Sequence, residues 1–159
     1  GAEFAYEAFE ENYLHRGGVL DDRNAVLRLR KTADKTLLTY KEKVGTSTEF
    51  KQQIEHETIV EDVDATERII DRLGYHLSVV YEKHRKAWHF GNVEIVLDEL
   101  PFGVYMEIEG SMKDILTVEK QLGADELEVE TRGYPRLTAK HGKTINGVVE
   151  ARFEKTTAA

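Results

Sequence analysis

Cysteine is absent from the 159-residue sequence, and proline occurs only twice. The lack of cysteine excludes disulfide bonds, thiolate metal sites and cysteine nucleophiles, and it fits a reducing compartment. No Ser-, Gly- or Pro-rich linker divides the chain. No apolar run approaches the roughly 20 residues that span a bilayer, and no signal-peptide pattern opens the sequence. We therefore expect a single cytoplasmic domain with no membrane partner.

The sequence also lacks an excess of basic residues. Lys and Arg together number 22 against 30 Asp and Glu, which gives a formal net charge of −8. Such an acidic excess argues against binding of duplex nucleic acid through a positive surface, so no nucleic-acid partner is expected. What the chain does contain is 40% hydrophobic residues, including six Phe and seven Tyr. This content is enough for a packed core and excludes wholesale disorder.

Alternation of apolar and polar residues dominates the chain and predicts a mostly β structure. Two segments have helical spacing instead, and each ends at a glycine (Gly74 and Gly123) suited to a helix C-terminus. A short helix is also expected near Asp125–Glu130. The fold class is therefore α+β. The predicted helices are Val63–Leu73 and Met112–Leu122, and the predicted strands are Phe4–Leu14, Ala25–Arg30, Thr36–Lys43, Gln52–Val60, His76–Arg85, Lys86–Phe90, Val93–Leu97, Tyr105–Glu109 and, more weakly, Gly147–Phe153.

Several predicted strands carry charges two residues apart, which places them on one face of a sheet. Arg28 with Arg30 and Lys83 with Arg85 are cationic pairs, while Glu107 with Glu109 is anionic. A solvated face explains any single strand. The whole set favours a site for a polyanion and a divalent cation, because a solvated face would mix signs across strands. Arg and Lys bind phosphate oxygens, and carboxylates hold hard metal ions. In a closed barrel, this face would line the lumen.

Six short motifs, in this order along the chain, resemble the CYTH superfamily of triphosphate tunnel metalloenzymes. That superfamily includes class IV adenylate cyclases, thiamine triphosphatases and inorganic triphosphatases. The resemblance covers roughly residues 4–137, and Gly133-Tyr134-Pro135-Arg136-Leu137 is similar to a Ser-Tyr-containing segment near the family's C-terminus. The motifs are Leu27-Arg28-Leu29-Arg30, Leu38-Thr39-Tyr40-Lys41, Glu55-His56-Glu57, Lys83-His84-Arg85, Leu97-Asp98-Glu99-Leu100 and Glu107-Ile108-Glu109.

The resemblance implies a closed antiparallel β-barrel of about eight strands, forming a tunnel, with flanking helices. It implies an enzyme that hydrolyses inorganic triphosphate, thiamine triphosphate or a nucleoside triphosphate with Mg²⁺ or Mn²⁺. Two alternatives stay open: a class IV adenylate cyclase that converts ATP to cyclic AMP and pyrophosphate, and a non-catalytic polyphosphate- or nucleotide-binding module. The partner is a small-molecule triphosphate, and a homodimer is the assembly that the family suggests.

Site roles also follow from the resemblance. The cations that would bind the substrate are Arg28, Arg30, Lys41, Lys83 and Arg85, with Lys43 a weaker addition. The carboxylates that would hold the metal are Glu55, Glu57, Asp98, Glu107 and Glu109. Of these two sets, Glu107, Glu109 and Lys83 are the predicted catalytic residues.

One family feature is not found. The hallmark Glu-x-Glu-x-Lys strand has no match before Phe4, and Val148–Arg152 is a poor imitation that gives little support to circular permutation. The segments that end at Leu73-Gly74 and Leu122-Gly123 repeat a helix-then-strand pattern, and Gly1 opens a strand in the same way. We therefore expect a single CYTH-like domain over residues 1–156 that lacks the family's first strand and first helix.

Other chemistries have weaker support. The six histidines show no His-x-x-x-His pair on a predicted helix, so a zinc site is not expected. Gly17-Gly18 lacks the spacing of a phosphate-binding loop. The serines have no nucleophile-elbow motif around them.

Overall fold

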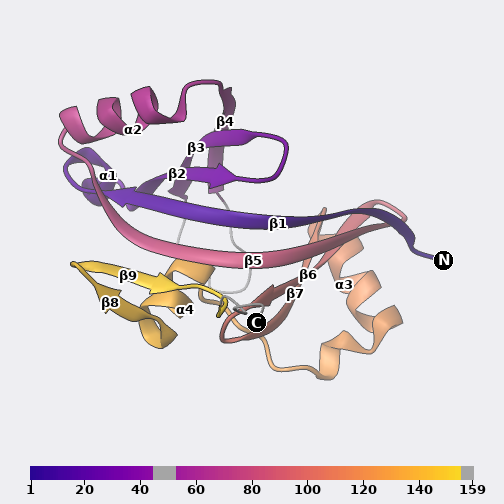
Figure 1. The fold of residues 1–159 in the computed structure, drawn as a ribbon. Helices are drawn as coiled ribbons and strands as arrows, with labels where there is room; N and C mark the ends of the chain where they lie inside the picture. The colour runs from indigo at the N-terminus through magenta and orange to yellow at the C-terminus, as the bar shows by residue number, and fades with distance from the viewer. Residues whose placement is uncertain (45–52, 155–159) are drawn as a thin grey trace, which may run out of the picture.

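A computed structural model describes residues 1–44 and 53–154 of the chain. Its strands form one sheet in which seven follow the order β4-β3-β2-β1-β5-β6-β7, and each of these pairs with its neighbours in antiparallel fashion (Figure 1). The strands are β1 (Glu3–Arg16), β2 (Ala25–Lys31), β3 (Thr36–Lys43), β4 (Gln53–Val60), β5 (His76–Phe90), β6 (Val93–Leu100), β7 (Gly103–Glu109), β8 (Lys143–Ile145) and β9 (Val148–Ala151).

The two longest strands, β1 and β5, lie side by side at the middle of the sheet (Figure 1). The sequence predicted two strands, His76–Arg85 and Lys86–Phe90, where the structure has the single strand β5. That division was wrong, because no turn residue separates Arg85 from Lys86 and the alternation of facing continues across them. The second edge of β5 is shared: β6 pairs with residues 84–90, and β9 pairs in parallel with residues 79–81.

The other predicted strands are confirmed within a few residues. Thr36–Lys43 has the predicted bounds, whereas β6 runs on to Leu100 and β7 begins at Gly103. Gln52, the first residue of one predicted strand, lies outside the described residues. The weak prediction over Gly147–Phe153 corresponds to the short strand β9.

In the described part of the chain, β4 and β7 are each paired along one edge only. Hydrogen bonds therefore do not close the sheet, and the expected closed barrel is not confirmed. The α+β class is confirmed, since the described residues are mostly strands with four α-helices. No helix in these residues is both long enough and apolar enough to cross a bilayer.

The two predicted helices form where expected. In α2 (Val63–Arg72), the Asp62 side chain accepts a hydrogen bond from the Ala65 N–H at 2.8 Å. In α3 (Met112–Leu122), the Ser111 side chain accepts one from the Asp114 N–H, and Gly123 ends the helix at φ 65°. Both ends follow ordinary capping rules. The helix expected near Asp125–Glu130 is only a 3₁₀ turn at Ala124–Glu126, because Leu127 adopts extended backbone angles.

Two helices were not predicted, α1 (Val19–Asp22) and α4 (Tyr134–His141). Helix α4 has Pro135 in its first turn and buries Tyr134, Leu137 and Thr138. A proline in the first turn followed by buried positions three and four residues apart is a helix signal, but it is a short one.

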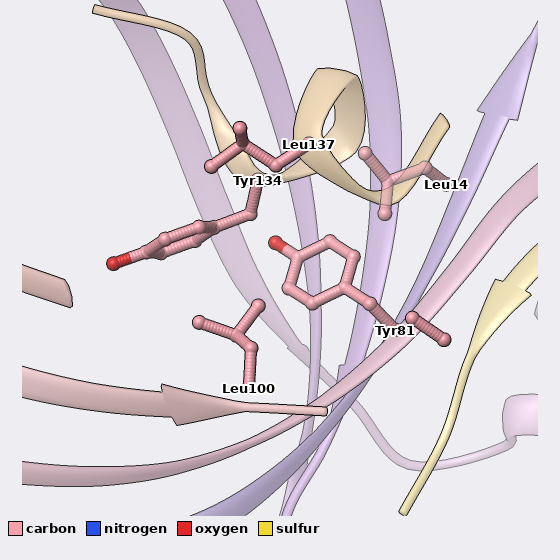
Figure 2. Packing of buried hydrophobic residues seen from close by; sticks show 6 residues of the cluster. Leu14, Tyr81, Leu100, Tyr134 and Leu137 are labelled. Atoms are coloured by element: carbon pink, nitrogen blue, oxygen red, sulfur yellow. The ribbon is translucent and has the colours of Figure 1, made fainter. Parts of the chain in front are cut away.

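The largest core cluster lies where α4 packs against the sheet. Tyr134 and Leu137 of α4 form one buried cluster with Tyr81 of β5, Leu100 of β6 and Leu14 of β1 (Figure 2). A smaller cluster packs Val118 of α3 against Val93 and Ile95 of β6. Helix α3 therefore covers one face of β6, while α4 covers part of the opposite face.

We expect Leu137→Ala to lower the free energy of unfolding by about 2–5 kcal/mol, because Leu137 is 1% exposed and its removal leaves a cavity under α4. Urea denaturation followed by circular dichroism measures the change. The control is Leu127→Ala, whose side chain is 62% exposed and whose effect should stay within about 0.5 kcal/mol. Equal losses in the two variants would contradict the placement of α4.

Candidate functional site

Charged side chains from seven adjacent strands meet on the face of the sheet that α4 partly covers. Alternation along each strand places them on this same face, and cross-strand pairs bring them into line. We call this the charged face. It is formed by Glu10 of β1, Arg28 and Arg30 of β2, Lys41 of β3, Lys83 and Arg85 of β5, and Asp98 of β6, with Glu55 and Glu57 of β4 and Glu107 of β7 at its two edges.

The centre of the charged face is a buried cluster of two cations and one carboxylate. Arg85 donates two hydrogen bonds to Asp98, from Nε at 2.7 Å and from Nη2 at 2.6 Å. Lys83 Nζ donates to Asp98 Oδ2 at 3.1 Å. The side chains of Lys83 and Asp98 are only 2% and 0% exposed. Such a pair is stable only because each charge has its partner and its hydrogen bonds.

Glu10 extends this cluster across β1. Its carboxylate lies 3.3 Å from Lys83 Nζ and 3.2 Å from Arg30 Nε, and its side chain is 4% exposed. Sequence reasoning missed Glu10. The available signal was that Glu10 alternates in phase with the apolar residues Ala8 and Leu14 of the same strand. A Glu in such a position is uncommon unless its charge is paired. Glu10 is the link between the cations of β2 and those of β5.

A second group of charges lies toward β4. Arg28 Nη2 is 3.4 Å from Glu55 and 3.8 Å from Glu57, and Lys41 Nζ is 3.3 Å from Glu55. The buried Thr39 hydroxyl donates to Glu57 at 2.8 Å. Here the carboxylates are more accessible than in the centre, since the side chains of Glu55 and Glu57 are 40% and 38% exposed.

At the opposite edge, Arg85 Nη2 donates to Glu107 at 3.1 Å, and the Glu107 side chain is 34% exposed. Glu109 is the last residue of β7, is exposed and lies opposite Glu94 of β6. The charged face thus has two kinds of carboxylate. Glu10 and Asp98 are buried between cations, whereas Glu55, Glu57, Glu107 and Glu109 face solvent at the edges.

The surroundings shift several protonation equilibria. Burial lowers the pKa of the Lys83 ammonium to about 8, although Glu10 and Asp98 oppose the change. Burial would raise the pKa values of Glu10 and Asp98, but the neighbouring cations outweigh it and hold both below their usual range. Near neutral pH, both buried carboxylates are therefore ionised, and the pKa of Lys83 lies only a little above neutral pH.

Tyr134 of α4 adds a neutral group beside these charges. Its ring lies 5.4 Å from Lys83 Nζ. Burial, together with the negative charges of Glu107 and Asp98, raises the pKa of its phenol above the usual value. Tyr134 therefore stays protonated and can donate a hydrogen bond at this end of the charged face.

The donor set suits a hard divalent cation that arrives together with a ligand. In the described part of the chain, no three or more His, Asp or Glu side chains form a ready-made metal cluster. The edge carboxylates instead come in pairs, Glu55 with Glu57 and Glu107 with Glu109. Mg²⁺ is commonly bound by one or two carboxylates plus substrate phosphates, and these pairs fit that pattern.

Most predicted site residues are brought together by the fold. All five predicted cations lie within salt-bridge distance of a carboxylate of the charged face, and so do Glu55, Glu57, Asp98 and Glu107 among the predicted carboxylates. Glu109 lies at the edge without such a pair among those described, and Lys43 ends β3 in an exposed position. Asp98 stays a predicted metal ligand, while its observed contacts are to Lys83 and Arg85.

Comparison with known proteins places this charged face in a family. The model of the CYTH domain matches residues 5–134. The chain belongs to the CYTH family. This confirms the resemblance that the six motifs indicated, and the charged face is the part of the CYTH domain on which those motifs meet. Among curated proteins, none matches the chain.

Solved structures with the same fold include the PH1012 protein of Pyrococcus horikoshii, which is 26% identical, with 86% of each chain covered and a TM-score of 0.76. A putative adenylate cyclase from Vibrio parahaemolyticus is 19% identical at a TM-score of 0.65, with 87% of this chain and 85% of that chain covered. The Hippeastrum protein HpAC1, described as a putative adenylyl cyclase with a dominant triphosphatase activity, is 16% identical at a TM-score of 0.63, with coverages of 92% and 88%. At these two lower identities the likeness shows the fold alone.

We expect Glu10→Gln to lower the free energy of unfolding at pH 7 by about 3 kcal/mol, because it removes a buried charge between Lys83 and Arg30. The loss should shrink in acid. A carboxyl group whose folded pKa is depressed stabilises the protein above its unfolded pKa, near 4.5 for Glu10, and this stability disappears as the pH falls through the folded value.

Urea denaturation between pH 3 and pH 7 measures this effect, and Glu67→Gln on α2 is the control. Glu67 pairs with Lys31 on the surface, with its side chain 42% exposed, so its loss should cost less than about 1 kcal/mol. A Glu10→Gln loss that stays constant down to pH 3 would contradict the ionised, paired state of Glu10.

Proposed function

We propose that this protein hydrolyses a triphosphate in a metal-dependent reaction on its charged face. The observation that carries the proposal is the convergence of five cationic side chains from β2, β3 and β5 on one face. Guanidinium and ammonium groups at neighbouring positions are the usual ligands of phosphate oxygens. Support from the comparisons is at the level of the CYTH family, and the structural relative HpAC1 is described as having a dominant triphosphatase activity.

The charge balance of the face explains why a divalent cation would be required. The five cations are accompanied by six carboxylates, Glu10, Glu55, Glu57, Asp98, Glu107 and Glu109, so these groups have no positive excess. A triphosphate adds several negative charges, and its oxygens must displace the edge carboxylates from Arg28, Lys41 and Arg85. Mg²⁺ or Mn²⁺ held by Glu55 with Glu57, or by Glu107 with Glu109, would compensate both. When bound, such an ion neutralises phosphate charge and lowers the pKa of a coordinated water.

The chain's own residues would bind and orient the ligand. Arg28 and Lys41 would hold one part of the phosphate chain, and Lys83 and Arg85 another. Glu10 and Asp98 would keep Lys83 and Arg85 in place. Fixed charges in a partly dry environment stabilise the charge that develops during phosphoryl transfer. Lys83 Nζ, with its pKa near 8, can keep its proton at neutral pH and stabilise the leaving oxygen. Helix α4, which buries Tyr134 and Leu137 against the sheet, would limit access of water at one end.

The first experiment measures phosphate release from inorganic triphosphate, thiamine triphosphate and ATP with Mg²⁺ or Mn²⁺. Release that requires the metal would support the proposal and identify the substrate. Cyclic AMP and pyrophosphate from ATP would assign a cyclase instead. Tight binding of a triphosphate without any product would leave a binding module.

We expect Arg28→Ala to weaken the interaction with the triphosphate by roughly 10- to 100-fold, because hydrogen bonds to charged groups contribute about 1.5–3 kcal/mol each. The change should appear in KM or, for binding alone, in the Kd measured by calorimetry. Arg16→Ala is the matched control, since Arg16 pairs with Asp21 at the protein surface. A similar loss in the two variants would show that the effect is general charge rather than the charged face.

Glu107→Gln should change the metal requirement, because Glu107 is one of the edge carboxylates able to exchange Arg85 for a metal ion. We expect the concentration of Mg²⁺ that gives half-maximal turnover to rise at least tenfold, with the melting temperature nearly unchanged. Titration of the metal at saturating substrate measures this. An unaltered titration would remove Glu107 from the metal site.

A further inference from the structure

The face of the sheet opposite the charged face has a stripe of exposed aromatic and apolar residues. Phe4 and Phe9 of β1 are 57% and 41% exposed, and Leu97 of β6 is 39% exposed. Trp88 of β5 contacts Phe4 edge to face, with ring centroids 5.8 Å apart. Contiguous exposed apolar patches on a small domain commonly mark interaction sites. We call this surface the aromatic stripe.

Other segments cover the same face on both sides of the stripe. On one side, Val118 of α3 packs over Val93 and Ile95. On the other, Arg152 forms ion pairs with Glu11 and Glu82, and the ring of Phe153 lies 4.9 Å from that of His84. The Phe153 ring also lies 6.4 Å from that of Phe9, so this segment partly covers Phe9. Within residues 1–44 and 53–154, the open part of the stripe is therefore the end of the β1–β5 ladder that carries Phe4, Glu7, Lys86 and Trp88.

Two oppositely charged side chains in the middle of the stripe form only a long, exposed ion pair. Glu7 and Lys86 are cross-strand partners whose side chains are 67% and 58% exposed, with their charged atoms 4.0 Å apart. An exposed pair at that distance contributes little within one chain. Both groups are therefore available to a partner that presents a cation opposite Glu7 and an anion opposite Lys86.

The ladder itself has this complementary pattern. Phe4 lies opposite Trp88, Glu7 opposite Lys86, and Phe9 opposite His84. A twofold axis that runs along the ladder between two stacked copies places β1 of one copy over β5 of the other at the same level. Each residue then faces its own cross-strand partner from the second copy: Phe4 meets Trp88, and Glu7 meets Lys86. Sheets stack in this way with their strands roughly aligned, and an isologous interface requires such self-complementarity.

We propose that the aromatic stripe is the interface of a homodimer in which two copies stack through β1 and β5. The occupant is a second copy of this chain because the stripe complements itself in both apolar contact and charge. The charged face lies on the opposite side of the sheet, so two sites face outward from the dimer. The proposal is independent of the reaction at the charged face.

The test measures the mass of the protein in solution by sedimentation velocity from about 1 to 200 µM. We expect twice the mass of the chain for the wild type at the upper concentrations. Glu7→Lys places lysine opposite Lys86 of the second copy, and Lys86→Glu places two carboxylates together. Each should raise the dimer dissociation constant at least tenfold, and the double variant Glu7→Lys/Lys86→Glu should restore dimerisation.

Lys140→Glu, a charge reversal on the exposed surface of α4 on the opposite side of the sheet, is the control and should leave the dimer intact. Circular dichroism checks that each variant is folded. Phe4→Ser, at a residue that is 57% exposed, tests the apolar contact without a change of charge and should also raise the dimer dissociation constant. The proposal is overturned if the wild type is a monomer at 200 µM, or if the dimer persists unchanged in both single charge variants. A double variant that fails to re-form the dimer would also overturn it.

Discussion

The ionised state of Lys83 is the constraint on which the charged face depends. An ammonium group that is 2% exposed is stable only beside negative charge, and the chain supplies that charge from two directions, Glu10 on β1 and Asp98 on β6. Each of these carboxylates holds a further cation, Arg30 and Arg85. One buried lysine thus links β1, β5 and β6 and, through its two carboxylate partners, fixes the positions of Arg30 and Arg85.

The carboxylates of the charged face differ in role according to their burial. Glu10 and Asp98 are enclosed and keep the cations oriented, whereas the edge carboxylates Glu55, Glu57 and Glu107 are between 34% and 40% exposed and can release their partners. A triphosphate bound as proposed would therefore meet cations that are already positioned and would lose little by displacing the outer carboxylates. Preorganised charges of this kind are the main means by which proteins stabilise phosphoryl transfer.

Much of this could be predicted from the sequence, because alternation in strands is a local property. The pairs Arg28 with Arg30 and Lys83 with Arg85 follow directly from a period of two, and their convergence followed from the family motifs. Glu10 could not be found in this way, since its role depends on Lys83, which is 73 positions away in sequence and reaches it only through the β1–β5 ladder. The segment around Tyr134 resembled a family motif, but the position of its side chain beside Lys83 could not be predicted, because α4 is a two-turn helix whose place is fixed by packing on Tyr81 and Leu100. Closure of the sheet depends on the two edge strands, and local pattern contains no information about that.

The central position of the β1–β5 ladder also has a consequence for the order of folding. Strands β1 to β4 form one meander of neighbours in sequence, and β5 to β7 form another, each from contacts that close short loops. Among the described residues, the ladder that joins the two meanders is that of β1 with β5, whose paired residues are about 60 to 86 positions apart. Contacts at that separation form late. Glu10 contacts Lys83 across the β1–β5 ladder. The charged face is therefore complete only when this ladder has formed. If the two meanders formed first, each would carry part of the charged face with its charges unpaired.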